Sequence, residues 1–107
     1  MKEVRAYIHS NRIGSVIAAI KESTAWGSDH NLTAYMVKGL LLPQSDGERH
    51  YSLDLGDEVI NEYKLELHCE DEHVDEIVAI IRTMARTGQS TAGWVYVAEI
   101  ARAIPIA

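Results

Sequence analysis

The stretch that decides the fold runs from residue 64 to residue 106 and reads KLELHCEDEHVDEIVAIIRTMARTGQSTAGWVYVAEIARAIPI. Its first six residues alternate between apolar and polar side chains, which is the period of a half-buried β-strand. From Val74 to Ala85 the apolar residues recur at helical spacing and form a broad stripe. Residues 94–100 are apolar on both faces, which predicts a strand that must be covered on both sides. The stretch therefore predicts a strand, a helix and a second strand.

Two residues mark the expected ends of this helix. Asp71 stands just ahead of it, where a carboxylate can accept the free amide hydrogens of the first turn, so we expect it to be the N-cap. Gly88 stands just past the other end, where a left-handed backbone conformation costs a glycine least. The segment between Gly88 and the second strand is then a short turn.

The first third of the chain repeats the same order. Residues 2–9 alternate as a strand, Ile13 to Ser23 carries apolar residues at helical spacing, and residues 32–38 alternate again. Ser10 or Asn11 can cap the helix. Two such halves in one domain of residues 1–107 predict an α+β, ferredoxin-like sheet with both helices on one face. The other face also carries apolar residues, and a surface of that kind usually marks an interface, so we predict a homo-oligomer.

The two halves are joined by a long arm, residues 39–63. It holds Pro43 and the turn signal at residues 45–47, and residues 40–42 could pair with residues 50–55 as a hairpin. A connection of this length in a small domain is often functional or disordered. Two interpretations stay open, an arm that binds a partner or a ligand and an ordered hairpin packed on its own oligomer.

The totals exclude several classes of protein. The chain has 107 residues and a net charge of -6 at pH 7, which argues against an electrostatic grip on nucleic acid. A single cysteine excludes an internal disulfide framework. The first residues do not resemble a signal peptide, and no apolar run approaches the ~20 residues of a membrane helix. We expect a cytoplasmic protein without membrane insertion.

The order of these elements resembles the P-II nitrogen regulatory proteins. The matching residues include Val37-Lys38-Gly39 closing the second strand, then the arm, then residues 64–67. Further matches follow the arm: Asp75, Ile80, Ile81, Arg82, Thr83, Thr87, Gly88, Gly93, Ala101, Arg102 and Ile106. The resemblance implies a trimeric signalling protein whose arm, the T-loop, docks on a transporter, an enzyme or a regulator. It also implies adenine nucleotides in the clefts between subunits.

The same resemblance implies a binding site. Thr33, Gly39, Thr87 and Gly88 match positions on the adenine and ribose side of the cleft, and Gly93 matches a glycine of a phosphate-holding turn. With the neighbouring segments, the candidate effector-binding residues are Thr33, Val37, Lys38, Gly39, Thr87, Gly88, Gln89, Ser90 and Gly93.

The chain departs from the family where the family holds phosphates and magnesium. The matching positions that carry a glycine, a glutamine or cations in the family hold other residues here: Leu42, Pro43, Glu62, Thr91, Trp94, Pro105 and Ala107. Leu55 stands where some members carry a modified tyrosine. Because phosphates need fixed cations and donors, we do not expect sensing of Mg-ATP with 2-oxoglutarate. The sequence does not name the effector; ADP, AMP and ATP are the candidates. Trp94 would stack on a base or fill a subunit contact.

Two other functions are compatible with residues of this sequence. The five histidines and one cysteine could make a metal-responsive regulator, for example if His9 and His68 approached each other across the sheet or a threefold axis gathered histidines. An acylphosphatase-like enzyme would use Asn11 and Arg12, after the first strand, to place a water and bind phosphate. Arg12 is equally well explained as a surface charge, so we expect a regulator and not an enzyme, with no metal site predicted.

Overall fold

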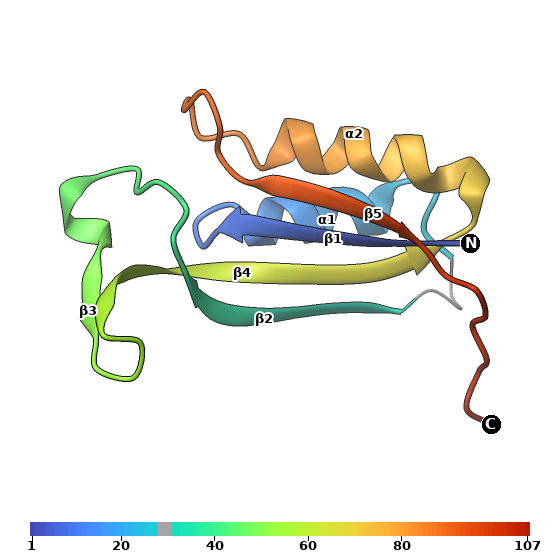
Figure 1. Cartoon of the computed structure of the whole chain (residues 1–107). Coiled ribbons are helices and arrows are strands. Elements are labelled where there is room, and N and C mark those ends of the chain that lie inside the picture. The colour runs from blue at the N-terminus through green and yellow to red at the C-terminus, as the bar shows by residue number, and fades with distance from the viewer. Residues whose placement is uncertain (28–30) are drawn as a thin grey trace.

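The structure, a computed structural model, describes residues 1–27 and 31–107 and confirms both strand–helix–strand halves (Figure 1). The regular elements follow in this order: β1 Lys2–His9, α1 Ile13–Glu22, β2 Leu32–Gly39, β3 His50–Ser52, β4 Asp57–Cys69, α2 Val74–Met84 and β5 Trp94–Glu99. Two 3₁₀ turns, η1 Asp46–Glu48 and η2 Asp71–His73, precede β3 and α2.

The main sheet has the strand order β2-β4-β1-β5, and every neighbouring pair is antiparallel. The two central strands, β1 and β4, come from different halves of the chain, so the halves interlock through them. The short strand β3 pairs only with the start of β4. This topology confirms the predicted ferredoxin-like α+β fold.

A single hydrophobic core lies between the sheet and the two helices. Alternate side chains of β1 and β4 point into it, and both helices contribute their apolar stripes, which confirms that the helices share one face. Cys69 is buried there as a free thiol, and burial raises its pKa. The buried members are Val4, Ala6, Ile8, Val16, Ile20, Ala25, Leu65, Leu67, Cys69, Ile77 and Ile81.

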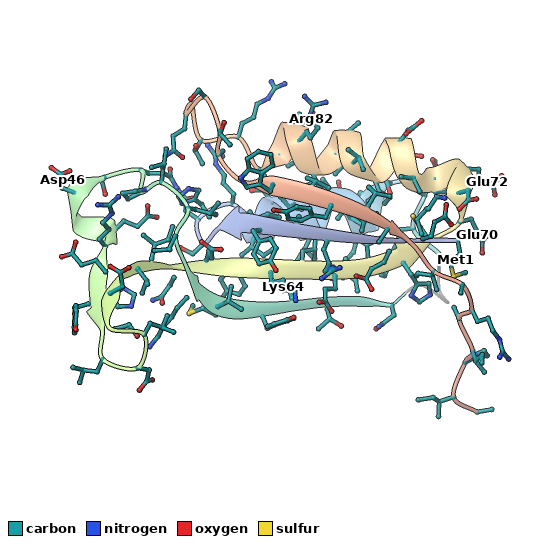
Figure 2. All side chains as sticks on the ribbon, in the orientation of Figure 1. Met1, Asp46, Lys64, Glu70, Glu72 and Arg82 are labelled. Atoms are coloured by element: carbon teal, nitrogen blue, oxygen red, sulfur yellow. The ribbon has the colours of Figure 1, made fainter. Side chains whose placement is uncertain are left out.

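The other face of the sheet carries aromatic and charged side chains. The Lys64 ammonium, labelled in Figure 2, lies 6.0 Å from the centre of the Tyr7 ring and 5.5 Å from that of Tyr35. Trp94 and Tyr96 of β5 are half exposed. The expected apolar character of this face is therefore supplied mainly by aromatic rings, while its centre is polar.

The predicted hairpin between residues 40–42 and 50–55 is wrong. β3 pairs instead with residues 57–59, the start of a β4 that is thirteen residues long. A turn closes this hairpin: the Gly56 amide donates to the Ser52 carbonyl over 2.8 Å, and Gly56 adopts a positive φ of 67°. Residues 57–63 of the arm are thus part of a strand that continues into the sheet.

Both predicted helix caps are also wrong. α1 begins after Arg12 and α2 after His73, and neither cap residue makes a side-chain cap bond. The Asp71 carboxylate lies instead 2.8 Å from the amino nitrogen of Met1. Gly88 has the predicted positive φ, 89°, but α2 ends four residues earlier, at Met84. In the described ranges we find no helix with the length and apolar character that crossing a membrane requires.

Substitutions of two separate glycines test how closely the turn before β5 packs against β1. A Cβ added at Gly93 would overlap the backbone carbonyl oxygen of Tyr7, whereas one added at Gly14 in α1 would meet nothing. We expect Gly93→Ala to lower the free energy of unfolding by about 1–3 kcal/mol. Gly14→Ala should raise it by about 0.4–1 kcal/mol. Urea unfolding followed by circular dichroism measures both, and equal stabilities for the two variants would contradict this packing.

Candidate functional site

A cavity of about 350 Å³ lies beside the turn that connects α2 to β5. Its wall is mostly the turn between these two elements, and its floor is the C-terminal part of β1. Four of the candidate residues line it: Gly88, Gln89, Ser90 and Gly93. Tyr7, Ile8 and Trp94 contribute from the strands, and Arg82 and Arg86 from the end of α2 and just beyond it.

The shape of the turn follows from local contacts. Gly93 lets the backbone approach the Tyr7 carbonyl, which a side chain would prevent. The Thr87 hydroxyl donates to the side-chain Oε1 of Gln89 over 2.6 Å. The backbone N–H of Gln89 donates to the oxygen of the same hydroxyl over 3.3 Å. Thr87 does not itself line the cavity, but it holds the Gln89 side chain in one orientation.

Gln89 connects the cavity to the arm. With Oε1 held by Thr87, its Nε2 donates to the carbonyl oxygens of Leu42, at 2.9 Å, and Pro43, at 3.2 Å. The donor group of an amide side chain thus bonds the first residues of the arm, while the same residue lines the cavity. One side chain therefore joins the turn to the base of the arm.

Further polar contacts hold the base of the arm against the body. The Gln44 amide group donates to Oδ1 of Asn11 over 2.9 Å. One carboxylate oxygen of Glu48 accepts from the Gln44 backbone at 2.6 Å, and the other lies 3.2 Å from Nδ1 of His9. His9 is only 1% exposed, so it is covered by the arm and does not lie on an open polar face. Figure 2 shows Asp46 at the outer corner of the arm.

Glu62 is a buried carboxyl at the same junction. It is 4% exposed, accepts a long bond of 3.4 Å from the Leu41 amide, and lies against Gly39, where it fills the space of a Cβ. Burial raises its pKa, while the Leu41 amide and His9 act in the opposite direction. The carboxyl therefore helps to hold the start of the arm, and its burial costs folding free energy when it is ionised.

The remaining candidate residues lie on the far edge of the sheet. Thr33, Val37, Lys38 and Gly39 belong to β2, which pairs with β4 and is separated from β5 by two strands. One chain therefore does not bring the β2 residues and the turn residues into one pocket. If they form a single site, as the resemblance implies, the site needs a second copy of the chain.

Two arginines that line the cavity were not among the residues predicted from the sequence. Arg82 and Arg86 both line the cavity, and Figure 2 shows Arg82 projecting from α2 near the turn. Their spacing of four residues, which places two side chains on one side of a helix, was the available signal.

The structure places several residues of the histidine and enzyme alternatives. His9 pairs in register with Glu62, and His68 with Glu3 near the other end of β1, so their expected approach is wrong. Within residues 1–27 and 31–107, no three side chains of His, Cys, Asp or Glu are placed to hold a metal ion. His30 lies outside the described residues. Asn11, a candidate for placing a water, bonds Gln44 instead.

The comparisons with known proteins agree on one family. A family model described as "Nitrogen regulatory protein P-II" matches residues 1–107. A protein of that name from Pyropia yezoensis is 26% identical over 107 residues, which covers 99% of this chain and 91% of that protein. A protein of the same name from Porphyra purpurea is 24% identical over 106 residues, with the same coverage.

Replacing Glu62 tests the buried carboxyl. Because its folded-state pKa is raised, the folded chain binds this proton more tightly than the unfolded chain does. The contribution of Glu62 to stability is therefore fully present below its unfolded pKa and is lost as pH rises through its folded pKa. Glu62→Gln keeps an acceptor for Leu41 and cannot ionise. We expect it to raise the melting temperature at pH 8 by several degrees, for a gain of about 1 kcal/mol, and by less near pH 4.5.

The control is Glu58→Gln, which removes an exposed carboxylate from the same strand and should change stability by less than about 0.5 kcal/mol. Calorimetric melts of the three proteins between pH 4.5 and pH 8 measure the effect. Parallel pH curves for Glu62→Gln and the parent would show that Glu62 carries no such penalty.

Proposed function

The chain belongs to the nitrogen regulatory protein P-II family, and from that premise we propose that it is a signal-transducing regulator. A small effector binds beside the turn 88–93, and the arm contacts a target protein. Proteins of this family are regulatory signal transducers that generally bind adenine nucleotides and are typically homotrimers. An adenine nucleotide is therefore the effector that we propose.

The observation that carries this proposal is the pair of bonds made by Gln89. A signalling protein must pass the presence of an effector to the surface that meets the target. Gln89 lines the cavity and bonds the carbonyls of Leu42 and Pro43 at the base of the arm. A ligand that contacts Gln89 competes with these bonds or strengthens them, and either result changes the arm.

The charges near the cavity favour a nucleotide with few phosphates. The cations that line it are Arg82 and Arg86, on the α2 side. The arm side offers Leu42 and Pro43, and Glu62 would repel phosphate when ionised. We therefore propose AMP or ADP, and not Mg-ATP with 2-oxoglutarate, as the effector.

The separation of the candidate residues supports a homotrimer. Thr33 and Gly39 lie on the β2 edge and Gly88 beside the β5 edge, so a complete cleft needs two neighbouring chains. The half-exposed rings of Trp94 and Tyr96 give the open face of the sheet an apolar surface that other copies can cover.

The outer part of the arm is suited to a target protein. Leu53 is 89% exposed, and Tyr51 and Leu55 are also largely exposed. Side chains of this kind, held on a short β-hairpin, can fill pockets on a partner. We propose this tip as the target-contacting surface.

Titration combined with proteolysis tests the effector and its coupling to the arm. We expect AMP and ADP to bind the parent protein in calorimetry more tightly than Mg-ATP, and binding to change the rate of tryptic cleavage after Arg49 in the arm. Gln89→Ala should remove most of that change in cleavage, because the link to Leu42 and Pro43 is lost.

The matched control is Gln44→Ala, which removes an arm contact to Asn11 outside the cavity and should leave the response of cleavage to the nucleotide in place. Mg-ATP binding that 2-oxoglutarate strengthens would contradict the proposed effector. An unchanged response in Gln89→Ala would contradict the coupling.

Sedimentation equilibrium tests the assembly. We expect the mass of three chains for the parent. Tyr96→Glu, which places a charge on the open face of the sheet, should shift the protein toward monomer, whereas Tyr51→Glu on the arm should not. A stable monomer of the parent at micromolar concentration would overturn the trimer and the shared cleft.

A further inference from the structure

The base of the arm covers three ionisable side chains that come from three separate segments. His9 ends β1, Glu48 ends η1, and Glu62 lies in β4. Nδ1 of His9 is 3.2 Å from Oε2 of Glu48. His9 is also the register partner of Glu62, so these two side chains lie on the same face of the sheet. One imidazole therefore lies beside two carboxyl groups, one from η1 and one from β4.

This cluster is largely shielded from water. The His9 side chain is fully buried, that of Glu48 is 20% exposed, and Glu62 is 4% exposed. Solvent and salt screen buried charges much less than charges on an open surface. The other carboxylate oxygen of Glu48 accepts the Gln44 amide over 2.6 Å, so Glu48 also fixes the segment that precedes η1. A change of charge in the cluster therefore bears directly on the base of the arm.

The contact with Glu48 determines which nitrogen of His9 carries the proton of a neutral ring. An ionised carboxylate only accepts hydrogen bonds, so Nδ1 is the donor. Nε2 of His9 is buried, and among the described residues it has no hydrogen-bond partner. A second proton therefore enters at Nε2 and makes the ring a cation. The two neighbouring carboxyl groups favour that cation, whereas burial disfavours it.

Three cations lie near this cluster and keep their charge across neutral pH. Arg12 donates its backbone amide to the His9 carbonyl over 2.9 Å, and Arg49 directly follows Glu48 in the chain. Lys64 follows two residues after the carboxyl of β4 and bonds another carboxylate of its own strand at 3.0 Å. Arginine and lysine side chains stay protonated well above pH 8. These cations therefore form a constant background to the titration of the cluster.

In the described sheet register, the neighbouring strands place no ionisable residue opposite this pair. The β1–β5 register ends at Tyr7 and Trp94, before His9, and Val37 of β2 pairs with Glu62 on its other side. Histidine is the side chain whose charge ordinarily changes between pH 5 and pH 8. Burial raises the pKa of Glu62, which moves its ionisation toward neutral pH. The histidine and this carboxyl are therefore the groups of the cluster that respond to pH.

We infer that His9, Glu48 and Glu62 form a proton-dependent latch, which holds the base of the arm at mildly acidic pH and releases it as pH rises above neutral. While the imidazole is charged and Glu62 is protonated, His9 attracts Glu48 and keeps η1 against the end of β1. Loss of both protons leaves two ionised carboxylates beside a neutral ring, so attraction is replaced by repulsion. This latch needs no effector and is independent of the proposed nucleotide.

Cleavage of the arm without any ligand tests the latch. We would measure the rate of tryptic cleavage after the exposed Arg49 from pH 6 to pH 8.5 and divide it, at each pH, by the rate on a short arginine peptide. The corrected rate of the parent should rise about threefold to tenfold across this range. His9→Asn keeps a side-chain donor for Glu48 but has no titrating ring, so it should lose most of this rise.

A second variant and a control accompany His9→Asn. Glu48→Gln keeps an acceptor for His9 but removes the charge, and it should also flatten the rise. The matched control is His73→Asn, because His73 also stands beside a glutamate, with its Nε2 3.7 Å from Glu72, but lies just before α2. Its corrected rate should follow that of the parent. Circular dichroism shows whether each variant folds.

Proton NMR of the parent gives a measure that needs no variant to fold. The ring signal of His9 should titrate with a midpoint within about half a pH unit of the midpoint of the cleavage rise. A corrected rate of the parent that does not change with pH would overturn the latch, as would a full rise in folded His9→Asn or Glu48→Gln. Midpoints more than one pH unit apart would do the same. Because no nucleotide is present, each of these failures would leave the proposed effector standing.

Discussion

The fold depends on burying one face of two central strands, β1 and β4, beneath two helices. These strands come from opposite halves of the chain, so neither half can complete its core without the other. Side chains such as Ala6, Leu65 and Ile81 are fully or almost fully buried, and burial of this kind is the main favourable term in folding. The helices cover only this face, and the aromatic residues of the edge strands remain on the other.

The same arrangement places the candidate site at one end of the sheet. β1 ends at His9, α2 ends nearby, and β4 begins beyond the sheet as part of the arm, so three polar segments meet there (Figure 1). The opposite end holds the chain's amino terminus, where Met1 pairs with Asp71 (Figure 2). The arm is therefore an extension of a core strand, and its base is fixed by Gln89, Glu48 and Glu62.

The sequence was sufficient for the regular elements because their signals are periodic. The alternation in residues 2–9 and 64–69 and the helical stripe after Val74 reflect which side chains meet the core, and the structure follows them. The caps could not be predicted in the same way, because the sequence does not show that the amino group of Met1 lies within reach of the Asp71 carboxylate. The hairpin prediction for the arm was wrong for a similar reason. The leucines of the arm repeat without a clear period, and the pairing of β3 with β4 depends on a turn at Gly56.

The departures from the family pattern are easier to understand together than one at a time. At Glu62, where the resemblance expects a lysine, a buried carboxyl accepts the Leu41 amide and occupies the space beside Gly39, so the arm base is held from within by a group that repels phosphate. At Trp94, where a second lysine is expected, an exposed aromatic residue stands at the start of β5. The charged residues that line the cavity are Arg82, in α2, and Arg86, just after it. The cations that the family pattern places at the arm are thus replaced, the arginines of the cavity lie in α2 and just after it, and the neutral side-chain amide of Gln89 joins the turn to the arm.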